Sequence, residues 1–149
     1  MIGDNETDGR EQIATLDDIL GFHIRLAHGA VYRHFTEAFA DLDLTQKQVS
    51  VLWLVGDEPG IAQTELGNRL RMDRATAMTI VSRMEVRGYL QRERAERDAR
   101  KLLLRLTPAG EAVLVRAKQC IAQHEAWLKR RFTPDEVKKL VEMLTRIHE

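Results

Sequence analysis

The sequence predicts a mainly helical protein with one small β-hairpin, organised as a winged helix-turn-helix between N- and C-terminal helices. Two strand-like runs, residues 89–94 and 101–106, flank a charged tip and follow two short helical patterns. In the second run Leu102, Leu104 and Leu106 alternate with other residues, which is the period-two spacing of a half-buried strand. Longer helical patterns precede and follow this block.

Composition limits the class of protein. The 149 residues amount to about one domain, with 44% apolar and 31% charged residues, as is ordinary for a globular chain. No apolar run is long enough to span a membrane, so no membrane partner is expected. Residues 1–12 are polar and acidic, which predicts disorder and, without signal-peptide features, a cytoplasmic location. The single cysteine, Cys120, excludes an intramolecular disulfide and a Cys-rich zinc site, and no metal or cofactor is expected.

Charge is distributed unevenly along a chain whose formal net charge is zero. Residues 1–61 hold four Lys and Arg against eleven Asp and Glu, a net of −7. Residues 62–106 hold eleven against six, a net of +5, and residues 107–149 hold eight against six, a net of +2. A DNA-binding surface needs such a local excess of cations, because phosphate neutralisation supplies most sequence-independent affinity. A solvated face rich in arginine is the alternative, and charge alone does not choose between the two.

The first half of the chain predicts four helices. One long helix is expected over residues 13–42, where apolar residues recur at spacings of three and four. A capping box, Thr45 with Gln48, opens a second helix that ends near Gly56. Residues 62–70 form the next short helix, and Asp73 caps another that ends at Gly88.

Two further helices follow the hairpin. Thr107 and Pro108 supply an N-cap and a first-turn proline for a helix over residues 108–131. Thr133 and Glu136 form a second capping box, which opens the final helix.

The helix after Asp73 has the composition of a DNA-reading helix. Ala77, Ile80, Val81 and Met84 lie at i, i+3, i+4 and i+7 and should face the core. The outward residues are small or cationic, as an approach to the major groove requires. They are Arg74, Ala75, Thr76, Met78, Thr79, Ser82 and Arg83. An ordinary amphipathic surface helix is the alternative.

All of these outward residues except Met78 are candidate contacts with DNA. Arg74 is suited to guanine, the Thr76 and Thr79 hydroxyls to bases or phosphates, and Ala75 to thymine methyl groups. Ser82 belongs to the same face, and Arg83 is placed for phosphate.

Residues outside the reading helix extend the candidate surface. Gln63 and Thr64 open the preceding helix, whose first N–H groups can hold a phosphate. Arg97 and Arg100 at the hairpin tip suit the negative potential of the minor groove. Asp98 would reduce attraction to DNA unless it fixes the pose of an arginine guanidinium. Simple solubility is the alternative explanation of the tip charges.

The run DARKLLLRLTPAG, residues 98–110, resembles the wing signature of the MarR family of transcriptional regulators, and residues 65–88 resemble its helix-turn-helix. The resemblance implies a homodimer that binds a near-palindromic site on double-stranded DNA, usually as a repressor. It implies a dimerisation region of residues 13–44 and 107–149 around a DNA-binding region of residues 45–106. By motif position Arg100 would be the minor-groove arginine and Asp98 its orienting partner.

Two positions depart from the family pattern. Ala62 stands where Ser or Thr often caps the helix, so Thr64 substitutes or the cap is missing at a cost near ~1 kcal/mol. Arg71 stands where the turn between the helices often carries Gly. If the backbone there is left-handed, a non-glycine residue is strained by about 1 kcal/mol or more. Arg71 is then either kept for its charge, on phosphate or on an acidic effector, or is a tolerated turn residue.

The resemblance also implies a small-molecule effector, often an aromatic carboxylate, in a crevice between the dimerising helices and the winged helix. Such a pocket needs flat apolar walls and one or two polar anchors. His23, Arg25, His28 and Trp53 are the candidates besides Arg71, and ordinary core packing is the alternative for each. Binding is expected to release DNA.

Other functions remain as alternatives. A redox-responsive regulator would use Cys120, which has Arg116, Lys118 and His124 nearby in sequence, although a buried structural thiol is the simpler interpretation. Catalysis is not expected, because the sequence holds no phosphate loop, nucleophile elbow or zinc-protease motif. An interaction module without DNA is the third alternative.

Overall fold

The computed structural model describes residues 13–149, which divide into two compact units at the boundary between Arg33 and His34. The expected disorder of residues 1–12 lies outside the described residues. Helices dominate both units, and the second also holds a small three-stranded antiparallel sheet. Within the described range, no helix is long and apolar enough to cross a membrane.

The expected long first helix is interrupted near its start, so the prediction of one helix over residues 13–42 is wrong. A short 3-10 helix, η1 (Leu16–Asp18), precedes α1 (Leu20–Ala38). The Asp18 carboxylate accepts from the Thr15 backbone N–H at 2.9 Å and from its hydroxyl at 3.1 Å. These local bonds close a separate turn, and the extended backbone of Ile19 (ψ 110°) divides it from α1.

The helix also ends earlier than the apolar pattern predicts. Residues 39–43 form a turn in which Asp43 has a φ of 48°, and its N–H donates to the Phe39 carbonyl at 3.0 Å. The left-handed backbone of Asp43 closes this turn and keeps the chain from continuing as a helix into α2. Leu42 and Leu44 are buried, so their apolar character marks a turn that packs into the core, rather than a continued helix.

The helices between residues 45 and 88 form where the sequence predicts. In α2 (Gln46–Asp57) the Thr45 hydroxyl accepts from the Gln48 N–H, while the Gln48 side chain accepts from the Thr45 N–H. The bounds of the next two helices are α3 (Gln63–Arg69) and α4 (Arg74–Val86). The Asp73 carboxylate caps α4 by accepting from the Thr76 N–H at 2.7 Å.

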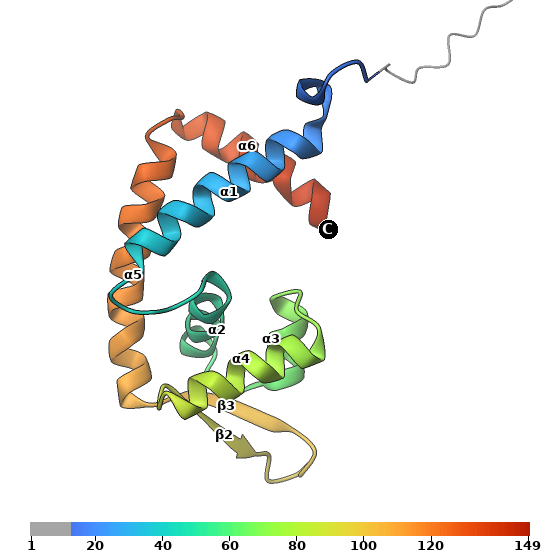
Figure 1. The fold of residues 1–149 in the computed structure, drawn as a ribbon. Coiled ribbons are helices and arrows are strands. Elements are labelled where there is room, and N and C mark those ends of the chain that lie inside the picture. The colour runs from blue at the N-terminus through green and yellow to red at the C-terminus, as the bar shows by residue number, and fades with distance from the viewer. Residues whose placement is uncertain (1–12) are drawn as a thin grey trace, which may run out of the picture. The chain divides into compact units, whose positions relative to one another are not determined.

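The hairpin forms as expected, with each strand one residue shorter at its start. The strands β2 (Leu90–Arg94) and β3 (Leu102–Leu106) are antiparallel, with Leu90 opposite Leu106. A third strand, β1 (Ile61–Ala62), was not predicted because it is too short to show a period, and it pairs with the other edge of β3. Figure 1 shows α2, α3 and α4 on one side of the hairpin, whose loop projects beyond them.

One apolar core holds these elements of the second unit together. Leu52 of α2, Leu66 of α3, Val81 of α4 and Leu104 of β3 are each fully buried in it. Hydrophobic burial of this kind is the main favourable term in folding. Residues 45–106 therefore form a packed body that holds these helices at fixed positions.

The last two helices begin at their predicted caps. The bounds are α5 (Pro108–Lys129) and α6 (Pro134–His148). The Thr133 hydroxyl accepts from the Glu136 N–H, and the Glu136 carboxylate accepts from the Thr133 N–H. Helix α6 has no buried residue, and four of its apolar side chains are exposed: Val141, Met143, Leu144 and Ile147.

A close junction joins α4, the hairpin and α5. Gly88, with a φ of 80°, ends α4, and Tyr89 leads into β2. The Tyr89 carbonyl accepts from the Thr107 N–H at 3.0 Å, and the Thr107 hydroxyl donates to the Gly88 carbonyl. At Gly110 a Cβ would lie 2.0 Å from the Tyr89 oxygen. Only glycine permits this approach of α5 to the chain that links helix and hairpin.

A stack of aromatic rings fixes the end of α1 to α5 within the second unit. The Nδ1 atoms of His34 and His124 share a hydrogen bond of 2.7 Å, in which one ring donates and the other accepts. The His34 ring lies 3.9 Å from the Trp127 ring, and Phe35 meets His124 edge-on. His124 is only 4% exposed.

We predict that Gly110→Ala destabilises the protein by ~1–3 kcal/mol, because the new methyl group would collide with the Tyr89 carbonyl. Gly21→Ala in α1 is the matched control: its Cβ meets nothing within 4 Å, so helix propensity should add up to ~1 kcal/mol. Urea denaturation of both variants measures the two changes. Equal effects of the two substitutions would contradict the close approach.

We predict that stability falls as the pH drops below about 6.5. Burial, and then the charge of His34, lower the pKa of His124 from its ordinary 6.5. The unfolded chain therefore protonates His124 near pH 6.5, while the folded chain does so only at a lower pH. Between the unfolded and the folded pKa the unfolded state binds more protons, so the contribution of His124 to stability is complete above pH 6.5 and is lost on acidification. Urea midpoints between pH 7.5 and 5.5 should decline less in a variant with both His34→Phe and His124→Phe. If the urea midpoint of that variant declines as much as that of the wild type, a group other than His124 is responsible.

Candidate nucleic-acid interface

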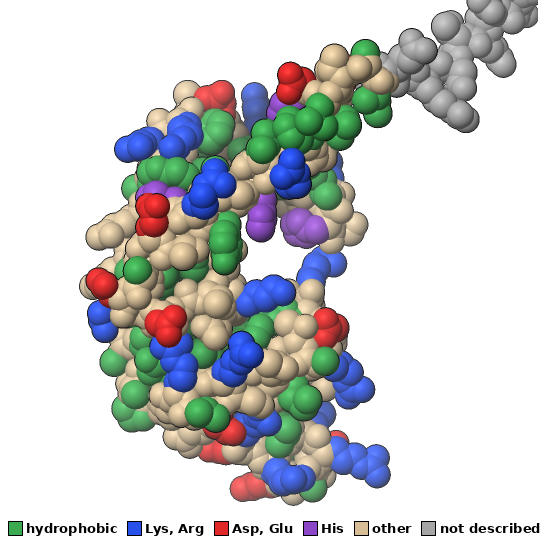
Figure 2. All heavy atoms as spheres, in the orientation of Figure 1, with side chains coloured by type: hydrophobic (Ala, Val, Ile, Leu, Met, Phe, Trp, Pro, Cys, Tyr) green, Lys and Arg blue, Asp and Glu red, His purple; other side chains and the backbone are tan. Residues whose placement is uncertain are grey.

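A groove of about 560 Å³ lies between α3, α4 and the wing hairpin, and it collects predicted DNA-contacting residues from all three elements. Gln63 and Thr64 come from α3, Arg74 from α4 and Arg100 from the hairpin loop. Figure 2 shows lysine and arginine side chains recurring over this part of the surface. The groove has the cations and the shape to take a nucleic-acid backbone.

The reading helix presents the predicted face. Ala77, Ile80, Val81 and Met84 are buried, as the helical spacing predicts. Five predicted outward residues are exposed, and they are Arg74, Ala75, Met78, Thr79 and Arg83.

The threonine hydroxyls of α4 are already engaged as donors. Thr76 donates to the Asp73 carboxylate at 2.9 Å and Thr79 to the Ala75 carbonyl at 2.9 Å. The two bonds from Thr76 lower the pKa of Asp73, the backbone N–H having the larger effect. In this arrangement each hydroxyl keeps only acceptor capacity, so it suits a donor on a base edge better than a phosphate oxygen.

Ser82 faces the hairpin, which corrects its placement on the outward surface. It is half-buried, and its hydroxyl accepts a hydrogen bond from the Arg92 guanidinium on β2. The helical pattern places Ser82 next to Arg83, but only the packing of α4 on β2 decides which of the two is free to meet DNA.

At the hairpin tip Asp98 acts on the main chain of Arg100. Its carboxylate accepts from the Arg100 backbone N–H at 3.0 Å, and its carbonyl accepts from the Lys101 N–H at 3.0 Å. The expected bond from Asp98 to a guanidinium is replaced here by bonds to backbone N–H groups. Arg94, which was not among the predicted residues, braces the loop by donating to the Ala99 carbonyl, and Arg97 is exposed.

The first turn of α3 has no side-chain cap. Ala62 occupies the N-cap position, and no side chain, including that of Thr64, bonds to the first N–H groups there. Gln63 is half-buried, and its Oε1 atom is buried without a hydrogen-bond partner. The N–H groups of this turn therefore remain available to an oxygen ligand such as phosphate.

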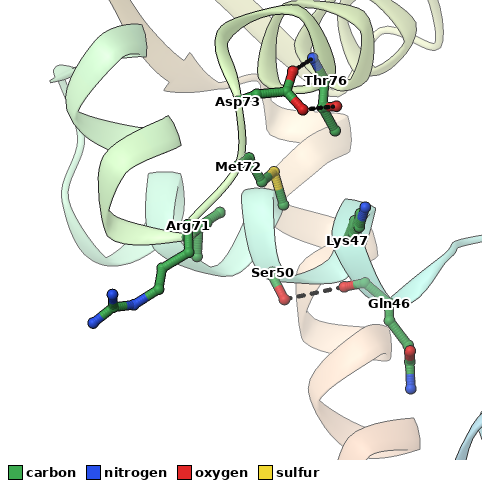
Figure 3. Close-up of a pocket in the computed structure, with 8 residues that line it drawn as sticks. Gln46, Lys47, Ser50, Arg71, Met72, Asp73 and Thr76 are labelled. Carbon is green, nitrogen blue, oxygen red and sulfur yellow. Dashed lines mark hydrogen bonds between the residues drawn. The ribbon is translucent and has the colours of Figure 1, made fainter. Parts of the chain in front are cut away.

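Arg71 has the left-handed backbone that its position in the turn implied, with a φ of 51°. It borders a small pocket formed by the start of α2 and the start of α4. In Figure 3 its guanidinium extends away from Lys47 and Ser50 and toward the outside of this pocket. Its side chain is exposed, so the strain coincides with a cation that is free to meet an anionic ligand.

The candidate effector residues lie in both units. In the first, His23 Nε2 is 2.7 Å from the Asp17 carbonyl, Arg25 lies 5.4 Å from the Phe22 ring centre, and His28 stacks on Tyr32. In the second, half-buried Trp53 of α2 lies 4.9 Å below the Lys118 ammonium group of α5. The cation beside Trp53 is a feature that sequence spacing does not reveal, because α2 and α5 are far apart in the chain.

The remaining reactive groups are the Cys120 thiol and the side chains that could bind a metal ion. Cys120 is half-buried on α5 and packs against the core, which is the environment of a structural thiol. Across residues 13–149, no group of three or more His, Cys, Asp or Glu side chains is placed to hold a metal ion.

Comparison with known proteins gives consistent similarities. Residues 42–101 match the model of the MarR family. The transcriptional repressor CouR, solved with a 23-mer DNA duplex, is 33% identical, covers 93% of this chain and 99% of its own, and has a TM-score of 0.86. PcaV of Streptomyces coelicolor, solved with its natural ligand, is 28% identical, covers 92% and 96%, and has a TM-score of 0.82. The transcriptional regulator TtmR of Methylorubrum extorquens is 29% identical over 136 residues, 91% of this chain and 69% of TtmR. These similarities confirm the winged helix-turn-helix fold.

We predict that Arg71→Gly is more stable than Arg71→Ala by about 1 kcal/mol, because glycine adopts the left-handed conformation without a Cβ penalty. Both variants lose the charge, so any affinity that depends on the guanidinium should fall equally in the two. Urea denaturation measures the first effect, and titration with DNA measures the second. Equal stability of the two variants would argue against backbone strain at this position.

Proposed function

This chain belongs to the MarR family of DNA-binding transcriptional regulators, and we propose that it is a ligand-responsive repressor. It binds a palindromic operator as a homodimer, and a small aromatic acid or its derivative releases it from DNA. Its relatives TtmR and CouR are a transcriptional regulator and a transcriptional repressor.

The observation that carries the proposal is the groove between α3, α4 and the wing. It combines an uncapped helix start, a reading helix with short outward side chains, and Arg100 on the loop, within one rigidly packed unit. CouR, which shares this fold at 33% identity, is a repressor solved on a DNA duplex. Arg74 would read a base edge while Arg100 enters the minor groove.

The exposed apolar side of α6 supports the homodimer. Val141, Leu144 and Ile147 are three residues apart, at helical spacing, and 43–64% exposed. Such a stripe on a capped helix is typical of a helix that packs against another helix. Twofold symmetry would place two reading helices about 34 Å apart, one turn of DNA, and would require a palindromic site.

An aromatic acid effector fits the chemistry of the candidate residues. Trp53 offers a flat ring with the Lys118 ammonium group beside it, and His23, Arg25 and His28 are exposed on α1. Aromatic walls with one or two cationic anchors are what a small aromatic carboxylate requires. PcaV, at 28% identity, is solved with a natural ligand. Arg71 is a further proposed anchor for the acid.

Release from DNA requires the effector to bind the DNA-incompetent form of the dimer more tightly than the competent form. The spacing of the two reading helices is the proposed variable, because it must match one DNA turn.

We predict that Arg74→Ala and Arg100→Ala each weaken binding to an operator duplex, one selected by the wild-type protein from a randomised pool. A lost base contact at Arg74 should cost ~1–3 kcal/mol and relax specificity at one position. The plot of log affinity against log salt should become shallower by about 1 for each cation that the variant removes from a phosphate. Fluorescence anisotropy over a salt series measures both.

Light scattering in the same buffers tests the dimer. Val141→Glu with Leu144→Glu should produce a monomer that binds the operator weakly, whereas Lys138→Glu with Lys139→Glu, charge changes without loss of apolar area, should leave a dimer. A wild-type monomer, or operator affinity that survives loss of both Arg74 and Arg100, would refute the proposal.

We predict that a benzoic or phenolic acid, or its thioester, binds the dimer and releases the duplex. Trp53→Ala and His23→Ala should weaken that binding without changing operator affinity in the absence of the acid. Isothermal titration across a panel of such compounds measures it, with Trp127→Phe as an aromatic control that is not among the proposed residues. No heat with any compound of the panel would remove the effector class from the proposal.

A further inference from the structure

We propose that Arg92 is a positioning residue for DNA binding, which locks the wing hairpin to the reading helix through Ser82 and Glu85. It acts by fixing the tilt of the hairpin and makes no contact with DNA itself. The proposal rests on the DNA-binding function described above.

The contacts of Arg92 cross from β2 to α4. Its guanidinium donates to the Ser82 hydroxyl, and its Nε atom lies 4.0 Å from the Glu85 carboxylate. Ser82 and Glu85 are three residues apart on α4 and therefore lie on one side of the helix. A single guanidinium thus spans two points along α4 from the middle of β2.

Arg92 differs in burial from the arginines that face solvent on the same hairpin. Its side chain is 20% exposed, whereas Arg94, Arg97, Arg100 and Arg105 are all exposed. Its Nε atom is buried without a hydrogen-bond partner, so this side chain is held inside the contact between helix and hairpin. A buried donor without a hydrogen-bond partner is unfavourable, so the contacts with Ser82 and Glu85 must offset that cost for the side chain to stay in this position.

The connection between α4 and β2 explains why a lock is needed. Only Arg87, Gly88 and Tyr89 join the helix to the strand, and Gly88 has a φ of 80°. Buried Leu104 and the pairing of β1 with β3 hold the second strand of the hairpin. Arg92 adds the polar contact that opposes a tilt of β2 against α4, three residues beyond the link. The distance and orientation between Arg74 and Arg100 are then fixed before DNA binds, so less conformational entropy is lost on binding.

Arg105 provides a matched control on the same hairpin. It pairs with Glu93 at 3.6 Å, and the two side chains are 50% and 53% exposed. Arg105→Met therefore makes the same chemical change as Arg92→Met. It removes a contact within the hairpin, however, and leaves the contacts between the hairpin and α4 in place.

The test measures operator affinity against salt for the full-length protein, with the duplex selected by the wild type, at a temperature where urea titration shows every variant folded. Arg92→Met should weaken binding about tenfold at every salt concentration, with an unchanged slope of log affinity against log salt, because no phosphate contact is lost. Arg105→Met should change affinity less than about twofold. Arg100→Ala, in contrast, should reduce the slope.

Ser82→Ala tests the lock without changing charge. It should weaken binding in the same direction as Arg92→Met, and the double variant should be no weaker than Arg92→Met alone, because both substitutions remove one interaction. A slope reduced by about 1 in Arg92→Met would mean that Arg92 contacts phosphate, and it would overturn the proposal. Unchanged affinity, or additive effects of the two substitutions, would also overturn it. Failure of the wild type to bind any duplex would instead refute the DNA-binding function.

Discussion

The DNA-reading geometry depends on one close approach, that of the Tyr89 carbonyl to the start of α5. Thr107 donates its N–H to that carbonyl and caps α5 with its hydroxyl, and Gly110 leaves the space that the carbonyl occupies. Because Tyr89 is also the last residue before β2, this contact fixes α4, the hairpin and α5 to one point. The Leu-Thr-Pro-Ala-Gly run therefore has a mechanical basis in addition to its value as a family signature.

Only some of the positive charges on this packed region are free to meet DNA. The +5 excess of residues 62–106 is spread over two helices, a hairpin and their turns, and many of these cations serve the protein itself. Arg87 donates to the Leu42 and Asp43 carbonyls, Arg92 to Ser82, and Arg94 to the loop carbonyl of Ala99. Arg74, Arg83, Arg97 and Arg100 are exposed, so they remain the proposed contacts to DNA. Net charge alone thus overstates the number of cations that are free to contact phosphate.

N-cap residues predicted helix starts reliably, because each cap side chain bonds to the first turn of the helix that it opens. Thr45, Asp73, Thr107 and Thr133 each cap the helix that they were expected to open. Apolar periodicity was less reliable at helix ends: it extended the first helix through Leu42, which is instead buried in a turn. The two-residue strand β1 lay below any periodic signal and formed because β3 offers it an open edge. The left-handed backbone at Arg71 was expected only through the glycine that relatives carry there.

Caps, periodicity and a contiguous motif predicted most of the helices, the hairpin, the core face of α4 and the family resemblance, because each of these signals acts within a few residues. Packing between distant segments sets which outward residues are free: Ser82 bonds to the hairpin, and Asp98 bonds to the backbone of Arg100. It also placed Lys118 over Trp53 and His34 against His124. The contacts of Ser82, Lys118 and His34 join segments that only packing brings together, and the contact of Asp98 depends on the exact path of a loop. Local spacing in the sequence encodes neither kind of contact.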